Sequence, residues 1–374
     1  MIKTYRPTWA EIDLKAIAYN YTQVCKLVGR DAKVMVVVKG NAYGHGIVEV
    51  SKLLTRKGAA YIGVATIDEA LLLRKSRIRI PILILGSVLP HEVDIALKSN
   101  ITLTVADEGL LKVIEKKAKA LKKIAKIHIE VDTGMGRMGV WHEDDALVFV
   151  YKAASSKSIY IEGIYTHFSS AARDKVYTNY QIESFEKILR QLSDSGLNIP
   201  YRHAANSIAT VNMKRSHLNL VRPGLIIYGM YPKKGLQRSV NLKPALSLKT
   251  RIVFIKDVPA GRSISYGRTY TTQSQTRIAT LPIGYADGYG RILSNKAEVL
   301  VKGERVPVVG KVTMDQTMIN VGHIKDVKEG DEIVLIGKQG HNDITTERLA
   351  RLAGTIPYEI VCSITDRVPR YYKK

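Results

Sequence analysis

The chain of 374 residues is long for a single hydrophobic core, and its hydrophobic content of 45% is enough to bury a large one. Its 57 lysines and arginines against 34 aspartates and glutamates give a formal net charge of +23, which could suit nucleic acid or an anionic membrane. The basic residues are spread along the chain in short clusters, without a basic arm or an RNA-binding signature. A solvated basic surface that attracts small anions is therefore the favoured interpretation.

The cysteines and the amino-terminal segment indicate the cellular compartment of the protein. Cys25 and Cys362 lie far apart and match no metal or redox spacing, so we expect buried, reduced thiols and no metal site. The amino-terminal segment has no apolar signal-peptide core, and no stretch approaches the length of a membrane span. These features predict a cytoplasmic protein with no membrane and no nucleic-acid partner.

A short strand is predicted at residues 9–13, followed by a helix at 14–28 that Gly29 ends. Apolar strand candidates then alternate with amphipathic helical stretches. The strand candidates are 34–38, 61–64, 82–85, 101–105, 126–131, 160–166, 201–204 and 218–221, and the clearest helices are 47–56, 68–75, 108–122 and 179–195. Eight strand–helix units predict a (β/α)₈ barrel of the TIM type rather than an open doubly wound sheet.

The strand–helix rhythm breaks around residues 230–244, and we expect a domain boundary there. The barrel is predicted to span residues 10–240 and a second, mainly-β domain to span 241–374. The second domain has β candidates at 246–255, 277–282, 297–301, 306–312 and 332–336, and one short helix at 346–352. The strand near residues 1–9 is a candidate member of this second domain.

Lys39 stands where a strand buried on both faces should stop. Three apolar β-branched residues precede it, and Gly40, Tyr43, Gly44 and His45 follow in a loop that allows close approach of the backbone to a ligand. For a lone lysine at such a place, a surface position is the usual interpretation. Other unusual polar residues also fall at or beyond the carboxyl ends of strand candidates, where barrel enzymes place their chemistry. These are residues 130–137, His167, Asn206, Ser207 and 222–224.

The segment around Lys39 resembles the pyridoxal-phosphate attachment segment of the alanine racemases. The resemblance implies that Lys39 forms a Schiff base with the cofactor and that Tyr43 contacts the cofactor phosphate. Residues 132–139 form a glycine-rich turn with an arginine, whose planar guanidinium can pair both oxygens of a carboxylate. This turn resembles the racemase motif for the substrate carboxylate, which implies that role for Arg137.

One residue departs from the family pattern beside this turn. Many alanine racemases have a lysine two residues before Asp132, and that lysine becomes carbamylated and faces the arginine. This chain has Glu130 at that position. We predict that the glutamate replaces the carbamate as an anion and orients Arg137 without modification.

Segments after the later barrel strands also resemble family motifs. The resemblance implies that His167 lies beside the catalytic tyrosine and tunes it, and that His203 supports the segment after the seventh strand. Asn206 and Ser207 would begin a helix whose amides and hydroxyl bind phosphate.

Arg222 matches the family arginine that hydrogen-bonds the pyridine nitrogen, and the backbone amides of Gly224 and Leu225 would meet the phosphate. An arginine, unlike a carboxylate, leaves the ring nitrogen unprotonated and weakens the electron sink. The carbanion at Cα is then short-lived, which favours racemisation over transamination.

Racemisation needs one group to remove the proton from one face of Cα and another to return a proton on the opposite face. The resemblance implies that Lys39 serves one face and Tyr266, in the second domain, the other. A phenol titrates near about 10 when unperturbed. A cationic environment from His167 and Arg222 is therefore expected to favour the phenolate of Tyr266.

Two more second-domain segments match the family. Residues 283–289, with Tyr285, would line the substrate entrance, and residues 312–316 would bind the substrate carboxylate through the backbone at Met314, supported by Asp315. In this family the second domain reaches the barrel of the other subunit. The resemblance therefore implies a homodimer with shared sites.

A second departure lies near the carboxyl terminus, where many relatives have a tyrosine that contacts the phosphate and this chain has Asp366. An ionised aspartate has no proton to donate to a phosphate, so Asp366 is not predicted to bind the cofactor. The resemblance spans nearly the whole chain in the family's order. It implies an enzyme of the isomerase class that supplies D-alanine for peptidoglycan.

Four alternatives remain at this stage. A racemase of another or a broader set of amino acids would share these motifs, because the pocket near Tyr285 and Met314 is not readable from sequence. A fold-related decarboxylase is disfavoured by Arg222, and a non-catalytic pyridoxal-phosphate homeostasis protein by the second domain. A nucleic-acid-binding protein would show salt-sensitive retention on DNA.

Overall fold

The structure is a computed structural model that describes residues 5–232 and 235–373. Lys233 and Lys234 of the predicted linker lie outside the described residues. The described chain forms two compact units: unit 1 comprises 5–17, 43–46 and 243–373, and unit 2 comprises 18–42 and 47–242. These units do not follow a single cut of the chain, so the limits 10–240 and 241–374 stay predictions.

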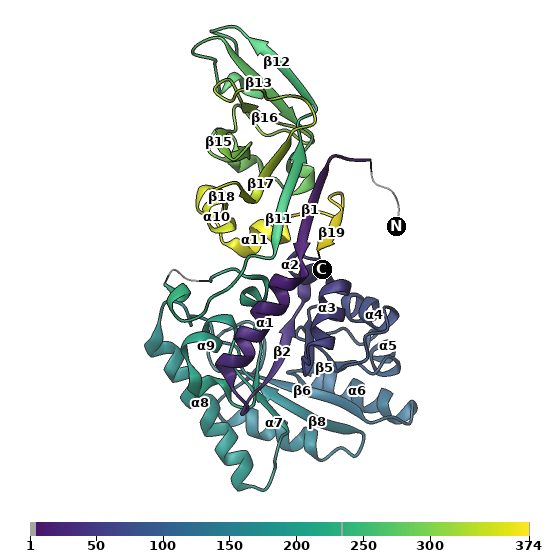
Figure 1. Cartoon of the computed structure of the whole chain (residues 1–374). Helices are drawn as coiled ribbons and strands as arrows, with labels where there is room; N and C mark the ends of the chain where they lie inside the picture. Colours follow the sequence, from purple (N-terminus) through teal and green to yellow (C-terminus); the bar gives the residue numbers. More distant parts are fainter. Residues whose placement is uncertain (1–4, 233–234, 374) are drawn as a thin grey trace. The chain divides into compact units, whose positions relative to one another are not determined.

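Unit 2 is a nearly closed parallel barrel, which confirms the predicted fold (Figure 1). Within the described residues its eight strands follow the order β10–β2–β3–β4–β5–β6–β8–β9. They are β2 (Lys33–Val37), β3 (Tyr61–Val64), β4 (Ile82–Ile84), β5 (Thr102–Val105), β6 (Ala125–Asp132), β8 (Ile159–Tyr165), β9 (Tyr201–His203) and β10 (Leu220–Val221), with β7 (Val140–Trp141) beside β6. The amide of Arg222 donates to the carbonyl of Ala205 at 2.9 Å, which links the segments that follow β10 and β9.

The helices of unit 2 lie between these strands in the chain. They are α3 (Ile47–Arg56), α4 (Ile67–Lys75), α5 (Val93–Lys98), α6 (Glu108–Ala120), α7 (Asp144–Ala154), α8 (Lys175–Asp194) and α9 (Ser207–Asn212). Two elements are shared between the units: α1 (Leu14–Val28) begins in unit 1 and ends in unit 2, and α2 (Lys39–Tyr43) begins in unit 2 and ends at Tyr43 of unit 1. The short 3₁₀ helices η1 (Lys214–His217), η2 (Leu225–Tyr228) and η3 (Leu236–Arg238) follow.

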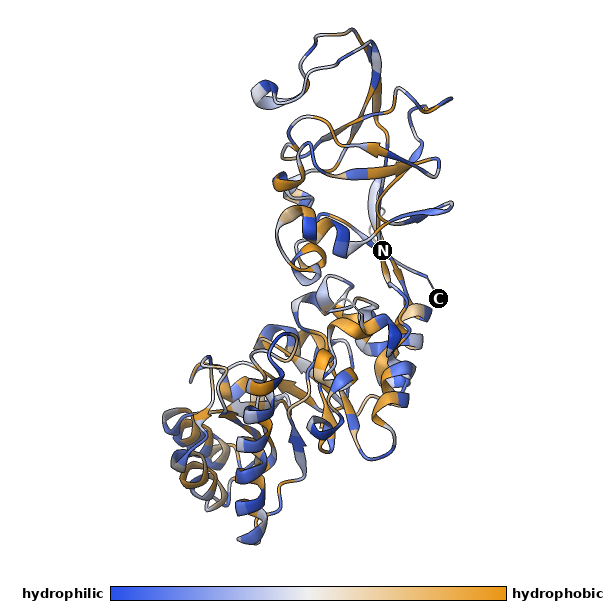
Figure 2. Cartoon of the chain, turned by 90° about the vertical axis from the view of Figure 1, so that its left-hand side faces the viewer, coloured by the Kyte–Doolittle hydropathy of each residue, from blue (hydrophilic) through white to orange (hydrophobic). Residues whose placement is uncertain are grey.

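The burial pattern explains why the alternation of strands and helices could be predicted from the sequence. Every residue of β3 and β5 is buried, as expected for parallel strands covered on both faces. Helix α6 instead buries only one face, through Leu110, Leu111, Ile114 and Ala118. Figure 2 shows both hydrophobic and hydrophilic residues on the helices of this unit.

Unit 1 is mainly β, as predicted. Its larger sheet has the order β15–β14–β17–β11–β1–β19, with β18 paired to β17, and its smaller sheet has the order β12–β13–β16. The strands are β1 (Thr8–Asp13), β11 (Leu246–Arg251), β12 (Phe254–Val258), β13 (Thr276–Leu281), β14 (Glu298–Val301), β15 (Glu304–Pro307), β16 (Thr317–Asn320), β17 (Glu332–Gln339), β18 (Asn342–Ile344) and β19 (Arg370–Lys373). The helices are η4 (Tyr266–Arg268), η5 (Tyr285–Asp287), η6 (Arg291–Leu293), α10 (Thr346–Ala353) and α11 (Pro357–Cys362).

Three details of unit 1 follow from its pairing. Strand β1 pairs with β11 and β19, so the first strand of the chain belongs to this sheet. The β candidate at 246–255 is present as two strands, β11 and the start of β12, which lie in different sheets. The predicted strand at 306–312 is present only as β15, which ends at Pro307.

The expectation of two buried thiols is wrong. Neither cysteine forms a disulfide within the described residues, but Cys25 is half-buried and Cys362 is exposed. Burial raises the pKa of the Cys25 thiol, which is hydrogen-bonded to Tyr21. Among the helices of the described residues, none combines the length and the apolar character needed to cross a membrane.

Candidate active site

The backbone after Lys39 turns in the left-handed sense. Residues 40–43 all have φ between 52° and 62°, a region that costs a residue other than glycine about 1–2 kcal/mol. Two side chains support this turn. The carboxylate of Glu69 accepts the amide of Gly40 at 2.6 Å, and the side chain of Asn41 accepts the amide of Ile47 at 2.8 Å. Lys39 therefore begins a strained but braced turn directly after β2.

Arg222 is a buried cation whose partners are all neutral. It is 4% exposed, and it donates to His203 Nδ1 at 2.7 Å and to the carbonyls of Thr166 and Ala204 at 2.8 and 3.2 Å. His167 Nδ1 lies 3.3 Å from the same guanidinium. Burial lowers the pKa of Arg222 to about 10. Among the described residues, none of these bonds uses Nε, so the Nε–H remains for a ligand.

A chain of buried side chains continues from Arg222. Because arginine only donates, His203 accepts at Nδ1 and carries its proton on Nε2, which faces His128 Nδ1 at 2.8 Å. The proton of His128 is then on Nε2, which lies 3.8 Å from the carboxylate of Glu162. Burial lowers the pKa of both histidines. A Cβ on Gly163 would come within 2.4 Å of the His128 ring, so β8 needs a glycine there.

His167 is held in its neutral form. Burial, and then the positive charges of Arg222, Arg137 and Lys39, lower the pKa of His167 to about 3. The prediction that His167 contributes positive charge is therefore wrong, and the cation of the pair is Arg222. The electrostatic influence of three cationic side chains on one imidazole also indicates that they surround a common region of unit 2.

Glu130 and Arg137 are not hydrogen-bonded to each other in the described structure. Glu130 is buried and accepts from the Tyr165 hydroxyl at 3.0 Å, whereas Arg137 is exposed. Burial raises the pKa of Glu130, while the Tyr165 hydrogen bond and the charges of Arg222 and Arg137 oppose that rise. An influence of Glu130 on Arg137 is thus electrostatic in this structure.

Asp132 shapes the glycine-rich turn that carries Arg137. Its carboxylate accepts the amides of Gly134 and Met135, each at 2.8 Å, and of Gly136 at 2.9 Å. Three amide donors on one buried carboxylate hold the turn in a defined shape.

The predicted phosphate-binding residues lie at the start of α9 and η2. Helix α9 begins at Ser207, and the Asn206 side chain caps it by accepting the amides of Ile208 and Ala209. The amide of Gly224 is already bonded to Ser207 Oγ at 2.9 Å. The hydroxyl proton of Ser207 remains for a ligand oxygen, whereas the Gly224 amide is engaged.

The site residues predicted in the second domain belong to unit 1. Tyr266 in η4 is 71% exposed and Met314 is 53% exposed. The carbonyl of Met314 accepts the amide of Ala286 at 3.0 Å. Asp315 pairs with Arg367 at 2.6 Å.

Tyr43 and Tyr285 also group with unit 1. The ring of Tyr43 lies 5.8 Å from that of Tyr358. Tyr285 lines a cavity of about 240 Å³ together with Ile292 and Leu349. Asp366 is exposed and forms an ion pair with Arg370 at 3.7 Å.

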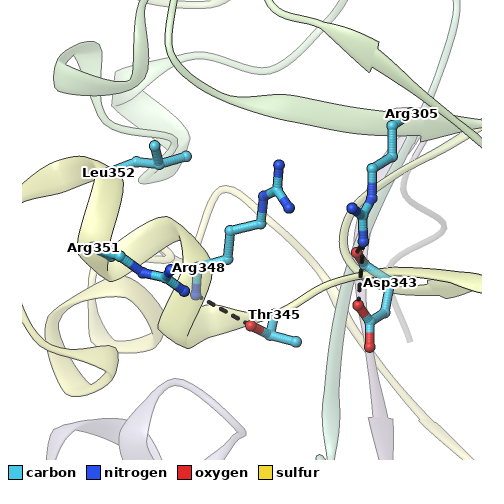
Figure 3. A pocket seen from close by; sticks show the side chains of 6 residues that line it. All are labelled: Arg305, Asp343, Thr345, Arg348, Arg351 and Leu352. Carbon is cyan, nitrogen blue, oxygen red and sulfur yellow. Dashed lines mark hydrogen bonds and ion pairs between the residues drawn. The ribbon is translucent and has the colours of Figure 1, made fainter.

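A second cavity of unit 1, of about 400 Å³, contains none of the predicted residues (Figure 3). Arg305 pairs there with Asp343 at 3.6 Å, and Arg348 pairs with Glu298. Two of the three arginines that line this cavity are therefore ion-paired, and Arg351 is the third.

Sequence reasoning missed the residues that brace the site. Glu69 supports the turn after Lys39, Tyr165 bonds Glu130, and Asp287 holds Arg6 and the amide of Gly284. Asp287 is fully buried, and a buried carboxylate is normally paired. A carboxylate inside the motif at 283–289 was the available signal, but its partner Arg6 lies 281 residues away.

The family models of two domains match this chain: the alanine racemase N-terminal domain over residues 12–232 and the alanine racemase C-terminal domain over residues 245–372. An alanine racemase of Halothermothrix orenii is 47% identical over 98% of this chain and 97% of the relative. One of Methanococcus maripaludis is 46% identical over 98% of each chain.

Solved structures agree with this assignment. An alanine racemase of Clostridium difficile 630 is similar with a TM-score of 0.94 and 39% identity, over 99% of this chain and 97% of that chain. The alanine racemase of Bacillus anthracis with bound L-Ala-P has a TM-score of 0.94 and 39% identity, over 100% and 96%. The predicted family is thereby confirmed: this chain belongs to the alanine racemase family.

Proposed function

We propose that this protein interconverts L-alanine and D-alanine with pyridoxal 5'-phosphate as cofactor, and that it supplies D-alanine for peptidoglycan in the cytoplasm. The observation that carries the proposal is the buried Arg222, which is hydrogen-bonded only to neutral acceptors. Such a cation suits the unprotonated ring nitrogen of the cofactor, whereas a carboxylate there would suit a protonated one.

The residues of unit 2 fit the cofactor. Lys39 would hold it covalently at the braced turn after β2, and the remaining Nε donor of Arg222 would face its ring nitrogen. The hydroxyl of Ser207 and the amide of Leu225 would donate to its phosphate, with Tyr43 of unit 1 as a further phosphate contact. The amide of Gly224 is engaged by Ser207 and would instead hold that hydroxyl in place. When bound, pyridoxal phosphate withdraws electrons from Cα of the amino acid and makes its proton acidic.

The chain itself would then supply the two proton-transfer groups and the carboxylate site. Lys39 Nζ would exchange a proton on one face of Cα and the Tyr266 hydroxyl on the other. Arg137, on the turn that Asp132 shapes, would bind the substrate carboxylate together with the backbone at Met314. The neutral His167 would accept a hydrogen bond rather than add charge.

We place the two proton-transfer groups on different subunits of a homodimer. Tyr266 and Met314 are exposed on unit 1, while Lys39, Arg137 and Arg222 belong to unit 2. In this arrangement the partner's Tyr266 completes the site around Lys39. Tyr285 and Asp315 would line the entrance to the site, and Asp315 would be held by Arg367.

The proposal is tested with purified protein and a panel of single enantiomers of amino acids. We expect racemisation of both alanine enantiomers, with alanine having the highest kcat/KM of the panel. Comparable kcat/KM values for several amino acids would instead support the alternative of a broader racemase. If the protein binds pyridoxal phosphate but racemises no amino acid of the panel, the proposal is contradicted. That result would favour a non-catalytic cofactor-binding protein.

A further inference from the structure

A cavity of unit 2 lies at the amino-terminal ends of the barrel strands, away from the ends that carry Lys39 and Arg222. It has a volume of about 490 Å³ and is lined by Thr102 at the start of β5 and Lys126 near the start of β6. The loops after α4, α5 and α6 also contribute lining residues. No motif of the sequence assigned a role to this cavity.

Four basic side chains line this cavity: Arg74, Arg79, Lys123 and Lys126. The guanidinium of Arg74 donates to the carbonyls of Ser99, Ile78, Ile80 and Asn100, at distances of 2.8 to 3.0 Å. The ammonium of Lys123 donates to the carbonyl of Leu97 at 2.8 Å and to the Asn100 side chain at 3.1 Å. Both cations are therefore held in fixed positions by neutral groups.

The positive charge of the cavity is not neutralised by the protein. Among the described residues, neither Arg74, Arg79 nor Lys123 forms an ion pair with a carboxylate, and only Lys126 does, with Glu162 at 2.7 Å. Arg74 is half-buried, and its burial lowers its pKa, so the charge is held at a cost in free energy. An anion in the cavity would offset that cost.

We propose that this cavity binds a small metabolite that carries a phosphoryl or carboxylate group. Arg79 and Lys126 would reach the anionic group from the exposed side, while Arg74 and Lys123 provide positive charge from the wall. Ile124 is 66% exposed at the same cavity and offers an apolar surface to the rest of the ligand.

The cavity is connected to the active site through the buried chain of side chains described above. Lys126 shares Glu162 with the Tyr61 hydroxyl, which lies 2.5 Å from the same carboxylate. Glu162 in turn faces His128, and the chain ends through His203 at Arg222. A bound anion would compete with Glu162 for Lys126. The net charge around Glu162, at the end of this row of side chains opposite Arg222, would then change.

The experiment is isothermal titration calorimetry on the cofactor-loaded protein with inorganic phosphate as one probe and citrate as another. Saturable binding of one probe per chain is expected, and the preferred probe distinguishes a phosphoryl from a carboxylate ligand. Arg79→Gln and Lys123→Gln should each weaken binding by about tenfold or more, because each removes a charged partner of the anion. Two separate variants guard against a folding defect in one of them.

Lys116→Gln is the matched control, because Lys116 is exposed on α6 outside the cavity and the variant changes the net charge equally. Unchanged binding in the control supports the cavity as the site. Absence of saturable binding, or equal weakening in all three variants, would overturn the proposal.

The coupling between this cavity and the active site is tested by adding the probe that binds to the racemisation assay. A change in kcat that is lost in Arg79→Gln supports it, whereas binding without any change in kcat or KM would overturn the coupling but leave the site.

Discussion

The guanidinium Nη1 of Arg222 donates to Nδ1 of His203 at 2.7 Å, and both side chains are buried inside the barrel. Because arginine offers no acceptor, this bond fixes the tautomer of His203 and, through it, that of His128. It also fixes the plane of the guanidinium, and therefore which of its donors is left for a ligand.

His203→Ala should lower the free energy of unfolding by about 1–3 kcal/mol. The substitution leaves Arg222 Nη1 and His128 Nδ1 buried without their present partner. Urea unfolding measures the change, and kcat should fall as well because Arg222 loses its orientation. His91→Ala is the control, since His91 is exposed. An equal loss in both variants would show that the buried bond has no special contribution.

Lys39→Ala and Tyr266→Phe should each lower kcat by about 10²–10⁴ fold, the usual contribution of a proton-transfer group. Tyr266 is 71% exposed, so its substitution should leave the melting temperature unchanged. Mixing the two inactive variants after dissociation should restore part of the activity, because mixed dimers then contain one intact site. Tyr151→Phe, an exposed tyrosine on α7, should retain full activity. No recovery on mixing would place both groups in the same subunit.

Asp132→Ala should raise KM for alanine by about 10-fold or more with a smaller effect on kcat. The variant removes the acceptor of three amides in the turn that carries Arg137, and each charged hydrogen bond contributes about 1.5–3 kcal/mol. Steady-state kinetics in both directions measure the split between KM and kcat. Asp31→Ala removes an exposed carboxylate and should change neither parameter.

Glu130→Gln should raise KM for alanine by about 3–10 fold, since it removes a negative charge near Arg137 while keeping an acceptor for the Tyr165 hydroxyl. The melting temperature should change little because the side-chain volume is conserved. Glu304→Gln, at an exposed position, is the control for loss of one negative charge. An unchanged KM in Glu130→Gln would contradict the assignment of Glu130 as the replacement for a carbamate.

The buried histidines should make the protein less stable in acid. His167 has a pKa of about 3 in the folded protein, against about 6.5 for an exposed histidine. Between these values the unfolded chain binds the extra proton, so stability is full above about pH 6.5 and decreases as the pH falls towards 3. His128 and His203 have lowered pKa values as well and act in the same direction.

The measurement is the free energy of unfolding in urea between pH 4.5 and 7 at a fixed cofactor concentration. His167→Gln should flatten the slope by up to about 1.4 kcal/mol per pH unit, the contribution of one proton. His91→Gln is the control at an exposed histidine and should leave the slope unchanged. Identical slopes for the wild type and His167→Gln would contradict the lowered pKa of His167.

The sequence by itself determined the alternation of strands and helices, the family, and the segments that carry Lys39, Arg137, Arg222 and Tyr266. All eight barrel strands lie within two residues of their predicted limits. These features were readable because apolar periodicity and short motifs are local properties of the chain. The break between β11 and β12 inside the β candidate at 246–255 was not predicted, because an apolar run does not show where the chain passes from one sheet to another.

Only the tertiary structure decided how Arg222 is held. Its partner His203 lies 19 residues earlier, and His128 lies 75 residues before His203, so their contacts depend on strand order and register rather than on spacing. For the same reason, the hydrogen bond from the Gly40 amide to Glu69, 29 residues away, could not be predicted from the sequence. The neutral state of His167 was likewise invisible in the sequence, because burial and nearby cations lower its pKa only once the barrel brings them together.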